Sequence, residues 1–201
     1  MKRNLVIFGE YVPLRRWLPF LKYLTPIEGG FTPGTTAVPF YLESLQVKTQ
    51  VLICFEDIFP HFARAEAEPD IDLLVNLTND GWFGEGAAQW QQAASGLFRA
   101  VENRLPLVRC ANNGLTCWVD SRGFLREIFH DESGSVYGKG FLTAAIPLLP
   151  KGVPHTLTFY TRHGDWFGWS CIGIAGLMLV RSFTSAWQSR NKRAKPRMDT
   201  N

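Results

Sequence analysis

Val51-Leu52-Ile53-Cys54-Phe55-Glu56 is the stretch that decides how this chain folds. Its run of apolar residues, closed by a polar residue, predicts a buried strand that delivers its last residues to a sheet edge. The segment Ile58–Glu68, rich in Ala and Glu, predicts a short helix directly after it. In α/β folds such strand ends open onto a crevice that holds functional groups. Cys54 is therefore a candidate nucleophile, and a small buried hydrophobe is the alternative interpretation.

The rest of the chain repeats this alternation of strands and helices, which predicts an α/β sheet fold. One helix is expected over Ala87–Asn103, where Trp90, Ala94, Leu97 and Val101 recur at helical spacing. A short strand opens the chain and ends at Gly9-Glu10-Tyr11. Further strands are predicted at Val38–Leu45, Val47–Val51, Ile71–Thr78, Leu107–Cys110, Leu115–Val119, Phe124–Phe129 and Gly140–Pro147.

Charge is distributed unevenly along the 201 residues, whose formal net charge is +3. Residues 181–201 hold six Lys or Arg and one Asp, so the preceding 180 residues carry 15 basic and 17 acidic groups. The body is thus nearly neutral, and only the tail is basic. Neither part has a recognition motif or a basic face, so we expect no nucleic acid partner.

The cysteines and histidines show no metal-ligand spacing, so no metal and no cofactor are expected. Cys110 and Cys117 flank the turn-like Asn112-Asn113-Gly114, and a disulfide between them is an open alternative. The four histidines are scattered, and we interpret all of them as structural or surface residues.

Several motifs occur in a fixed order. Lys2 precedes Phe8-Gly9-Glu10-Tyr11-Val12-Pro13, the Cys54 strand follows, and Asn79-Asp80-Gly81-Trp82-Phe83-Gly84 comes next. The order continues with Arg99–Arg104, Pro106–Arg109 and Ala111–Gly114. In these motifs the chain resembles the nitrilase (carbon–nitrogen hydrolase) superfamily and, within it, the apolipoprotein N-acyltransferases, over roughly residues 2–180. The resemblance implies an α-β-β-α sandwich, of which residues 1–160 would form the C-terminal part of the catalytic domain.

The resemblance also implies roles for individual residues, because the superfamily uses a Glu–Lys–Cys triad. Cys54 would be the nucleophile, and Lys2 would stabilise the thiolate and the oxyanion. Glu10 and Glu56 match additional glutamates of the family and would support the site. The general-base glutamate lies before the lysine, in sequence that this chain does not have. Residues 1–201 alone are therefore expected to be inactive.

Five further residues are candidates for substrate binding. Trp82 and Phe83, with Asn79 before them, would form a wall of the acyl or lipoprotein pocket, although aromatic core packing explains the two rings almost as well. Phe55 stands where the family often has Tyr. Trp17 belongs to Leu14–Leu24, which is either a core-packing amphipathic helix or, as the resemblance implies, a lid at the lipid interface.

The C-terminal stretch bears on localisation. Fifteen uncharged residues run from Trp166 to Val180, short of a full span unless the segment continues past Arg181 to Trp187. Tryptophans at both ends and small residues between them favour a transmembrane helix over a core helix. We therefore expect a membrane segment over residues 161–187 and a basic cytoplasmic tail over residues 188–201. The preceding domain would then face the periplasm from the bacterial inner membrane.

Three functions remain open. The first is an N-acyltransferase that moves an acyl chain from a phospholipid, through a Cys54 thioester, to the α-amine of a diacylglyceryl-apolipoprotein. The second is a carbon–nitrogen hydrolase acting on a small amide, for which the apolar C-terminal stretch and basic tail have no purpose. The third is a catalytically silent, membrane-anchored fragment that lacks the general base.

Overall fold

The computed structural model describes residues 1–14, 17–24 and 30–194. Internal contacts divide the chain into two units, Met1–Arg162 and His163–Asn201. Part of the expected lid (residues 15 and 16) and the last seven residues of the basic tail (195–201) lie outside the described residues.

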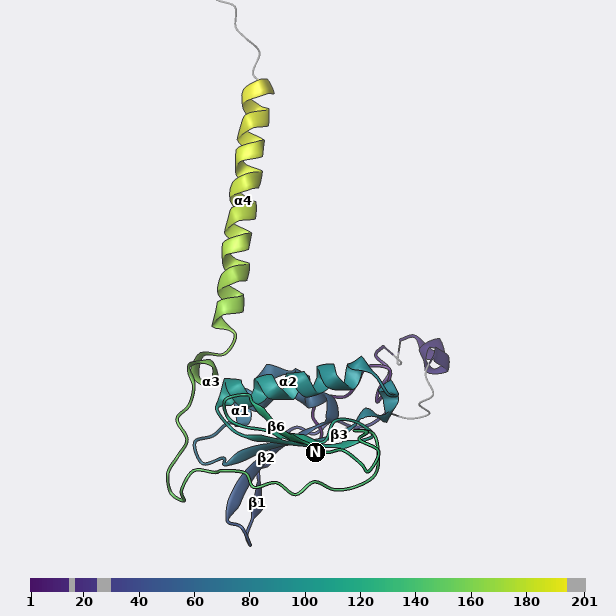
Figure 1. Ribbon diagram of the computed structural model, residues 1–201. Coiled ribbons are helices and arrows are strands. Elements are labelled where there is room, and N and C mark those ends of the chain that lie inside the picture. Colours follow the sequence, from purple (N-terminus) through teal and green to yellow (C-terminus); the bar gives the residue numbers. More distant parts are fainter. Residues whose placement is uncertain (15–16, 25–29, 195–201) are drawn as a thin grey trace, which may run out of the picture. The chain divides into compact units, whose positions relative to one another are not determined.

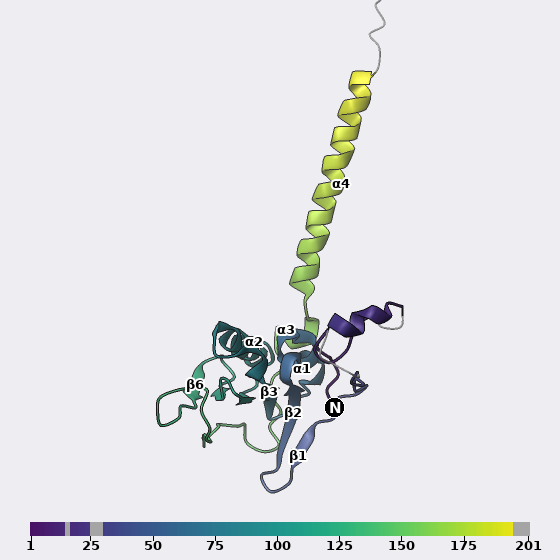
Figure 2. The same cartoon turned by 90° about the vertical axis from the view of Figure 1, so that its right-hand side faces the viewer.

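The first unit is built on one six-stranded mixed sheet in which neighbours along the chain are neighbours in space. The three central strands β2, β3 and β4 are parallel, while the flanking strands pair antiparallel. Helices α1 (Pro60–Glu66) and α2 (Ala87–Asn103) lie on one face of the sheet (Figures 1 and 2). The strands are β1 (Phe40–Leu42), β2 (Val47–Ile53), β3 (Leu73–Asn79), β4 (Leu107–Asn112), β5 (Cys117–Val119) and β6 (Leu125–Ile128).

The main core lies between the sheet and these two helices. Leu52, Leu74 and Leu107 come from the three parallel strands and are almost completely buried. Alanines of the helices, among them Ala63 and Ala100, pack against them, and their small side chains let the helices approach the sheet closely. Of the Val51–Glu56 stretch, Val51–Ile53 form the end of β2, where the helices cover Leu52, and Cys54–Glu56 begin a 3-10 helix.

The predicted helix over Ala87–Asn103 is confirmed at both ends. It stops because Arg104 adopts a left-handed backbone conformation with φ of 57°, which ends the helix. Most predicted strands are also present, with ends shifted by a few residues.

Two predicted strands are wrong. Gly140–Pro147 runs without a strand partner, and Pro147, which ends it, lacks the N–H that a sheet ladder needs. The opening segment is a turn instead of a strand, since the N–H groups of Gly9 and Glu10 both donate to the carbonyl of Val6. A segment that folds back on itself cannot extend along a sheet, and only an isolated bridge, Ile7 to Tyr11, remains.

The open alternative of a Cys110–Cys117 disulfide is also wrong, because both residues are free cysteines. Cys117 on β5 pairs with Arg109 on β4, so Cys110 is one residue out of register. Neighbouring residues of a strand point to opposite faces of the sheet. Cys110 is accordingly exposed while Cys117 is buried.

The second unit is dominated by the helix α4 (Trp166–Ala194), which follows the short helix α3 (Phe159–His163). Its segment Trp166–Trp187 has 22 residues, a mean hydropathy of 1.3 and no buried side chain. At about 1.5 Å per residue this segment reaches the roughly 30 Å of a bilayer core. By length and composition it is the apolar C-terminal helix that the sequence predicts.

Candidate active site

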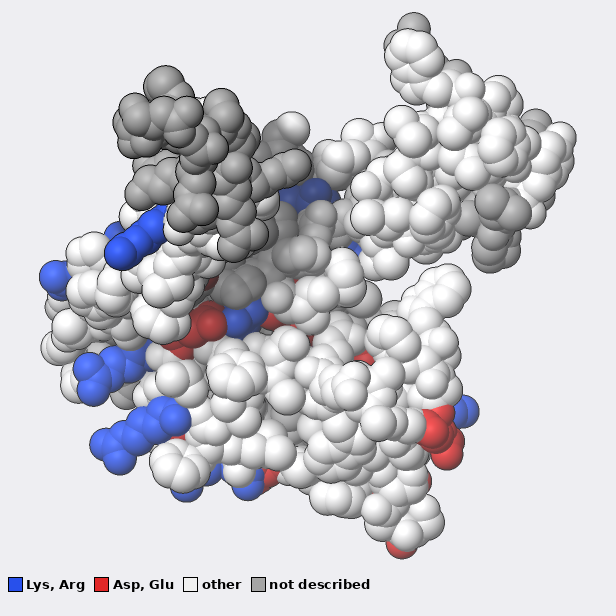
Figure 3. Space-filling view, turned by 90° about the horizontal axis from the view of Figure 1, so that it is seen from above, with Lys and Arg blue, Asp and Glu red and all other residues white. Residues whose placement is uncertain are grey.

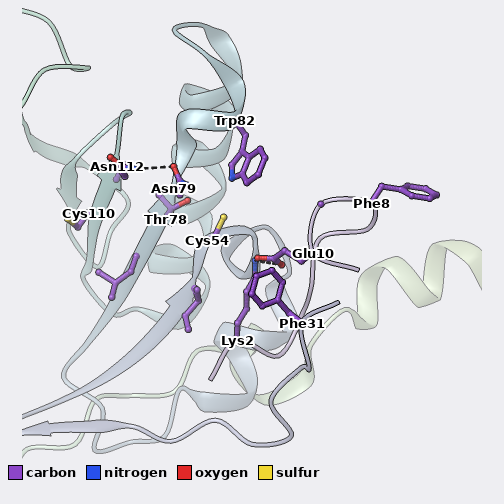
Figure 4. Close-up of a pocket in the computed structure, with 14 residues that line it drawn as sticks. Lys2, Phe8, Glu10, Phe31, Cys54, Thr78, Asn79, Trp82, Cys110 and Asn112 are labelled. Atoms are coloured by element: carbon purple, nitrogen blue, oxygen red, sulfur yellow. Dashed lines mark hydrogen bonds and ion pairs between the residues drawn. The ribbon is translucent and has the colours of Figure 1, made fainter. Parts of the chain in front are cut away.

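A cavity of about 1270 Å³ opens at the carboxyl edge of the three parallel strands. This is the edge to which β2, β3 and β4 deliver Cys54, Asn79 and Asn112. Figure 4 shows Cys54 between the two asparagines on one side and the Lys2–Glu10 pair on the other. Of the described residues, the cavity is lined by Lys2, Phe8, Gly9, Glu10, Phe31, Ile53, Cys54, Leu77, Thr78, Asn79, Trp82, Cys110, Ala111 and Asn112.

Cys54 stands at the point where β2 ends and a short 3-10 helix, η2 (Cys54–Ile58), begins. Its φ of 54° is left-handed, a conformation that non-glycine residues rarely adopt. Such strain persists only where the surroundings enforce it, and it concentrates at functional sites. Here the Asn76 side chain donates to the carbonyl of Cys54 (3.1 Å) and to that of Leu52 (3.3 Å).

Lys2 and Glu10 form an ion pair at the cavity wall. The Lys2 ammonium donates to both carboxylate oxygens of Glu10, at 2.7 and 2.6 Å. Glu10 in turn accepts from the backbone N–H of Val6 at 2.8 Å, within the same turn. The turn that replaces the expected opening strand is therefore what brings Glu10 back onto Lys2.

Glu56 joins the N-terminal segment to the strand that ends just before Cys54. Its side chain is only 1% exposed, and one oxygen accepts from the backbone N–H groups of Arg3 and, at 3.1 Å, of Asn4. The other oxygen accepts from the backbone N–H of Ile53 at 2.8 Å. A carboxylate that bonds both segments holds the residue after Lys2 beside the residue before Cys54.

The candidate substrate-binding residues separate into two groups. Asn79 and Trp82 line the cavity, and Asn79 accepts a hydrogen bond from Asn112 at 3.3 Å. Phe55 packs edge-to-face on Phe59, with ring centroids 5.1 Å apart, and does not line the cavity.

Phe83 is exposed on the 3-10 helix η3 (Asp80–Phe83), and Trp17 is 80% exposed before the 3-10 helix η1 (Pro19–Leu24). Neither lines the cavity. The core-helix alternative for Leu14–Leu24 is wrong for its described part, because Trp17, Phe20 and Tyr23 are all exposed.

Sequence reasoning missed Phe31 and Asn112 as lining residues. Phe31 lies in a turn-rich segment that carries no strand or helix signal, and its N–H donates to the carbonyl of Glu10 at 3.0 Å. Asn112 could have been found from its place at the carboxyl end of a parallel strand, which matches that of Asn79.

A buried polar cluster beneath the cavity was also missed. Arg109 is fully buried and donates to Asp57 (2.8 Å), Asp80 (2.7 Å) and the Asn76 amide oxygen (2.8 Å). Gln92 of α2 also donates to Asp57, at 3.4 Å. Burial raises the pKa of the Asp57 carboxyl to about 6, although the Arg109 guanidinium acts to lower it. One guanidinium here faces two carboxylates, so its charge does not compensate both of them.

No group of three or more His, Cys, Asp or Glu side chains that could hold a metal ion occurs among residues 1–14, 17–24 and 30–194. The ionisable groups available in the cavity are the thiols of Cys54 and Cys110, the Lys2 ammonium and the Glu10 carboxylate. This combination suits nucleophilic attack on a carbonyl carbon, with the ammonium facing the charge that develops on oxygen.

Comparison with known families assigns the class. The family described as Carbon-nitrogen hydrolase matches residues 2–145, which include the whole sheet and every cavity residue named above. The chain belongs to the carbon–nitrogen hydrolase family, and its mixed α/β sheet is that of the nitrilase-like fold.

Curated relatives narrow the resemblance. An apolipoprotein N-acyltransferase of Geobacter metallireducens is 40% identical over 182 residues, which is 90% of this chain and 33% of the relative. The enzymes of that name from Rickettsia prowazekii and Chlorobaculum tepidum are 42% and 33% identical, over 82% and 89% of this chain and 31% and 33% of their own lengths. The chain thus spans about a third of the length of the curated relatives it matches.

Among solved structures, a carbon-nitrogen hydrolase from Helicobacter pylori G27 is 19% identical and superimposes with a TM-score of 0.44, covering 50% of this chain and 42% of that one.

Proposed function

We propose that this chain forms part of an apolipoprotein N-acyltransferase. The observation that carries the proposal is the meeting of Cys54 with the Lys2–Glu10 ion pair in one cavity, on a chain similar to enzymes of that name along most of its length. The acyl donor is a phospholipid, and the acceptor is the α-amine of a diacylglyceryl-cysteine at an apolipoprotein N-terminus.

In the first half-reaction the Cys54 sulfur attacks the ester carbonyl carbon of the phospholipid. The new C–S bond forms, the ester C–O bond breaks, and the thiol proton passes through a carboxylate to the departing alkoxide. The products are a thioester on Cys54 and a lysophospholipid. Lys2 lines the same cavity and provides the positive charge that stabilises the oxyanion of the tetrahedral intermediate.

In the second half-reaction the acceptor amine attacks the thioester carbonyl. The C–N amide bond forms, the C–S bond breaks, and the proton lost by the amine returns to the sulfur. Among the described lining residues Glu10 is the carboxylate, and its bidentate contact with Lys2 suits it to hold the ammonium in place. The family resemblance places the proton-transferring glutamate before Lys2.

Exposed aromatic side chains support a lipid substrate. Trp17, Phe20 and Tyr23 are 58–80% exposed, and the lining residue Phe31 is 67% exposed. In Figure 3 the described surface of the segment that carries η1 is mainly white, so its aromatic rings lie among other uncharged residues there. Rings at such a surface can enter the headgroup zone of a membrane and admit acyl chains to the cavity, which is the role proposed for Leu14–Leu24 as a lid.

The helix α4 supports a membrane location for the enzyme. We propose that Trp166–Trp187 spans the bacterial inner membrane, with Trp166 and Trp187 at its two interfaces. The basic residues that follow, partly outside the described residues, would place the C-terminus in the cytoplasm and the cavity on the periplasmic side.

The test combines two reactions on the protein expressed from its complete gene and purified in detergent. Phospholipid and a synthetic diacylglyceryl-cysteinyl peptide should yield N-acylated peptide, and the Cys54→Ala variant should yield none. Release of ammonia from small amides, with no acylated peptide, would reject the acyltransferase in favour of the hydrolase. Neither product, despite correct folding, would favour the silent fragment.

A further inference from the structure

The backbone of Cys54 lies beyond the end of the sheet ladder. The last paired residues of β2 and β3 are Ile53 and Leu77, so the carbonyl of Cys54 has no strand partner in this register. That carbonyl instead accepts from the Asn76 side chain at 3.1 Å. Asn76 is the register partner of Leu52 and also donates to the Leu52 carbonyl at 3.3 Å.

The orientation of the Asn76 amide is fixed from the opposite side. Arg109 donates to its oxygen at 2.8 Å, and a guanidinium has no acceptor. The amide oxygen must therefore face Arg109, and the NH₂ group must face the two carbonyls of β2. Both side chains are buried, with Asn76 0% and Arg109 1% exposed, so water does not compete for these hydrogen bonds.

The same guanidinium also fixes the two 3-10 helices that follow β2 and β3. It is paired with Asp57 of η2 at 2.8 Å and with Asp80 of η3 at 2.7 Å. Asp80 is held further by Thr78, whose hydroxyl donates to it at 2.8 Å. One buried arginine therefore connects the segment that begins with Cys54, the segment that carries Trp82, and the amide that holds the Cys54 carbonyl.

We propose that Asn76, oriented by Arg109, is a positioning residue that holds Cys54 in its left-handed conformation and so aims its sulfur into the cavity. The Asn76 hydrogen bond is the side-chain contact made to the Cys54 carbonyl itself, so its loss would favour relaxation of the Cys54 backbone from φ of 54° to an ordinary conformation. Relaxation would turn the sulfur away from its present direction into the cavity that Cys54 lines. The inference rests on the proposed role of Cys54 as the nucleophile.

The discriminating variant is Asn76→Asp, which preserves the size of the side chain and its acceptor for Arg109 but replaces the donor with a second oxygen. The matched control is Asn103→Asp. Asn103 is also 0% exposed and donates to a backbone carbonyl, that of Arg99 at 2.9 Å, but it lies at the end of α2 and does not line the cavity. Asn76→Ser, whose hydroxyl is too short to reach both carbonyls and Arg109, is a second variant in case the first does not fold.

The primary measurement is the rate constant for alkylation of Cys54 by iodoacetamide, located by peptide mass spectrometry, together with the melting temperature. We expect alkylation to slow by about tenfold or more in both Asn76 variants, since small displacements of a reacting atom carry large rate costs. Asn103→Asp should lower the melting temperature by a similar amount and leave alkylation within about twofold of the wild type. Wild-type alkylation in the Asn76 variants, or equal slowing in Asn103→Asp, would overturn the inference.

Acylation by phospholipid, measured on the same variants, separates the inference from the proposed function. The maximal acylation rate should fall in Asn76→Asp, while the donor concentration for half-saturation stays unchanged. If phospholipid never acylates wild-type Cys54 but the alkylation rates differ as predicted, the acyltransferase proposal fails and the positioning role stands.

Discussion

The carboxylate of Glu56 accepts a hydrogen bond from the backbone N–H of Arg3, across 53 positions of sequence. The residue before Arg3 is Lys2, and the residue two positions before Glu56 is Cys54. This contact therefore connects the segment that carries the Lys2 ammonium to the segment that carries the Cys54 thiol. The site depends on it because the N-terminal segment has no strand of its own to hold it against the sheet.

Glu56→Gln should loosen the N-terminal segment. The glutamine NH₂ group would face backbone N–H groups that the carboxylate now accepts, which leaves buried donors unpaired at a cost of about 3 kcal/mol. Hydrogen exchange should become faster across residues 2–10, and acylation of Cys54 should fall. Glu68→Gln, at an exposed ion pair with Lys48, is the control and should change neither. Unchanged exchange in the Glu56 variant would show that other contacts place Lys2.

Lys2→Met should slow acylation of Cys54 by about a hundredfold, as expected when a group that stabilises an oxyanion is lost. The substitution preserves most of the side-chain volume but leaves Glu10 without its ion-pair partner, so the melting temperature should fall and the rate is compared at a temperature where both proteins are folded. Single-turnover acylation followed by mass spectrometry measures the rate. Lys48→Met removes a lysine from a surface ion pair and should retain the wild-type rate. A rate within a few fold of wild type in Lys2→Met would exclude the oxyanion role.

Most of the strands, the long helix and the location of Cys54 at the end of a central strand could be predicted because local pattern determines them. The apolar run before Cys54 and the helical spacing of Ala87–Asn103 need no distant partner to be recognised. That Lys2, Glu10 and Glu56 lie near Cys54 was predicted only from family motifs, since no local pattern indicates that residues some 50 positions apart in the sequence meet. The backbone partners of Glu56 were not predictable for the same reason.

The buried cluster around Arg109 could not be predicted, because an arginine in a predicted strand is normally interpreted as a solvent-exposed residue. Only the sheet register shows that it lies between Asp57 and Asp80. For Gly140–Pro147 the local pattern predicted a strand that the structure does not contain. The mostly apolar run of this segment is typical of a strand, but a strand exists only where a neighbouring segment offers hydrogen bonds.

Stability should depend on pH through Asp57. Its pKa in the folded protein is raised from the ordinary 3.8 to about 6, so the folded state holds the proton more tightly than the unfolded state. The stabilisation from this proton is complete below pH 3.8 and is lost as the pH rises through 6. The Asp57→Asn side chain does not titrate. Relative to this variant, the free energy of unfolding of the wild type should decrease by up to about 3 kcal/mol between pH 4 and pH 7.

Urea unfolding of both proteins at several pH values measures this difference. Asp120, whose pKa is lowered by hydrogen bonds from Phe124, Arg126 and Arg122 that outweigh desolvation, provides a control of opposite sign. The free energy of unfolding of Asp120→Asn should therefore decrease relative to that of the wild type as the pH rises. A pH-independent difference between wild type and Asp57→Asn would contradict the raised pKa.

Cys171 offers a test of the membrane segment, since it lies within Trp166–Trp187 and is exposed on its helix. If this helix spans a bilayer, a water-soluble maleimide should label Cys171 in permeabilised native membranes far more slowly than Glu132→Cys, which lies on an exposed turn. Both sites should react after denaturation. Equal labelling in the intact bilayer would show that the helix does not span it.

The most direct test of the central claim is the intact mass of the protein, expressed from its complete gene, after incubation with phospholipid in detergent. We predict the addition of one acyl group, which hydroxylamine removes and which is absent from Cys54→Ala. Such an adduct would establish the thioester on Cys54. No adduct on folded protein, or one that persists in Cys54→Ala, would contradict the account.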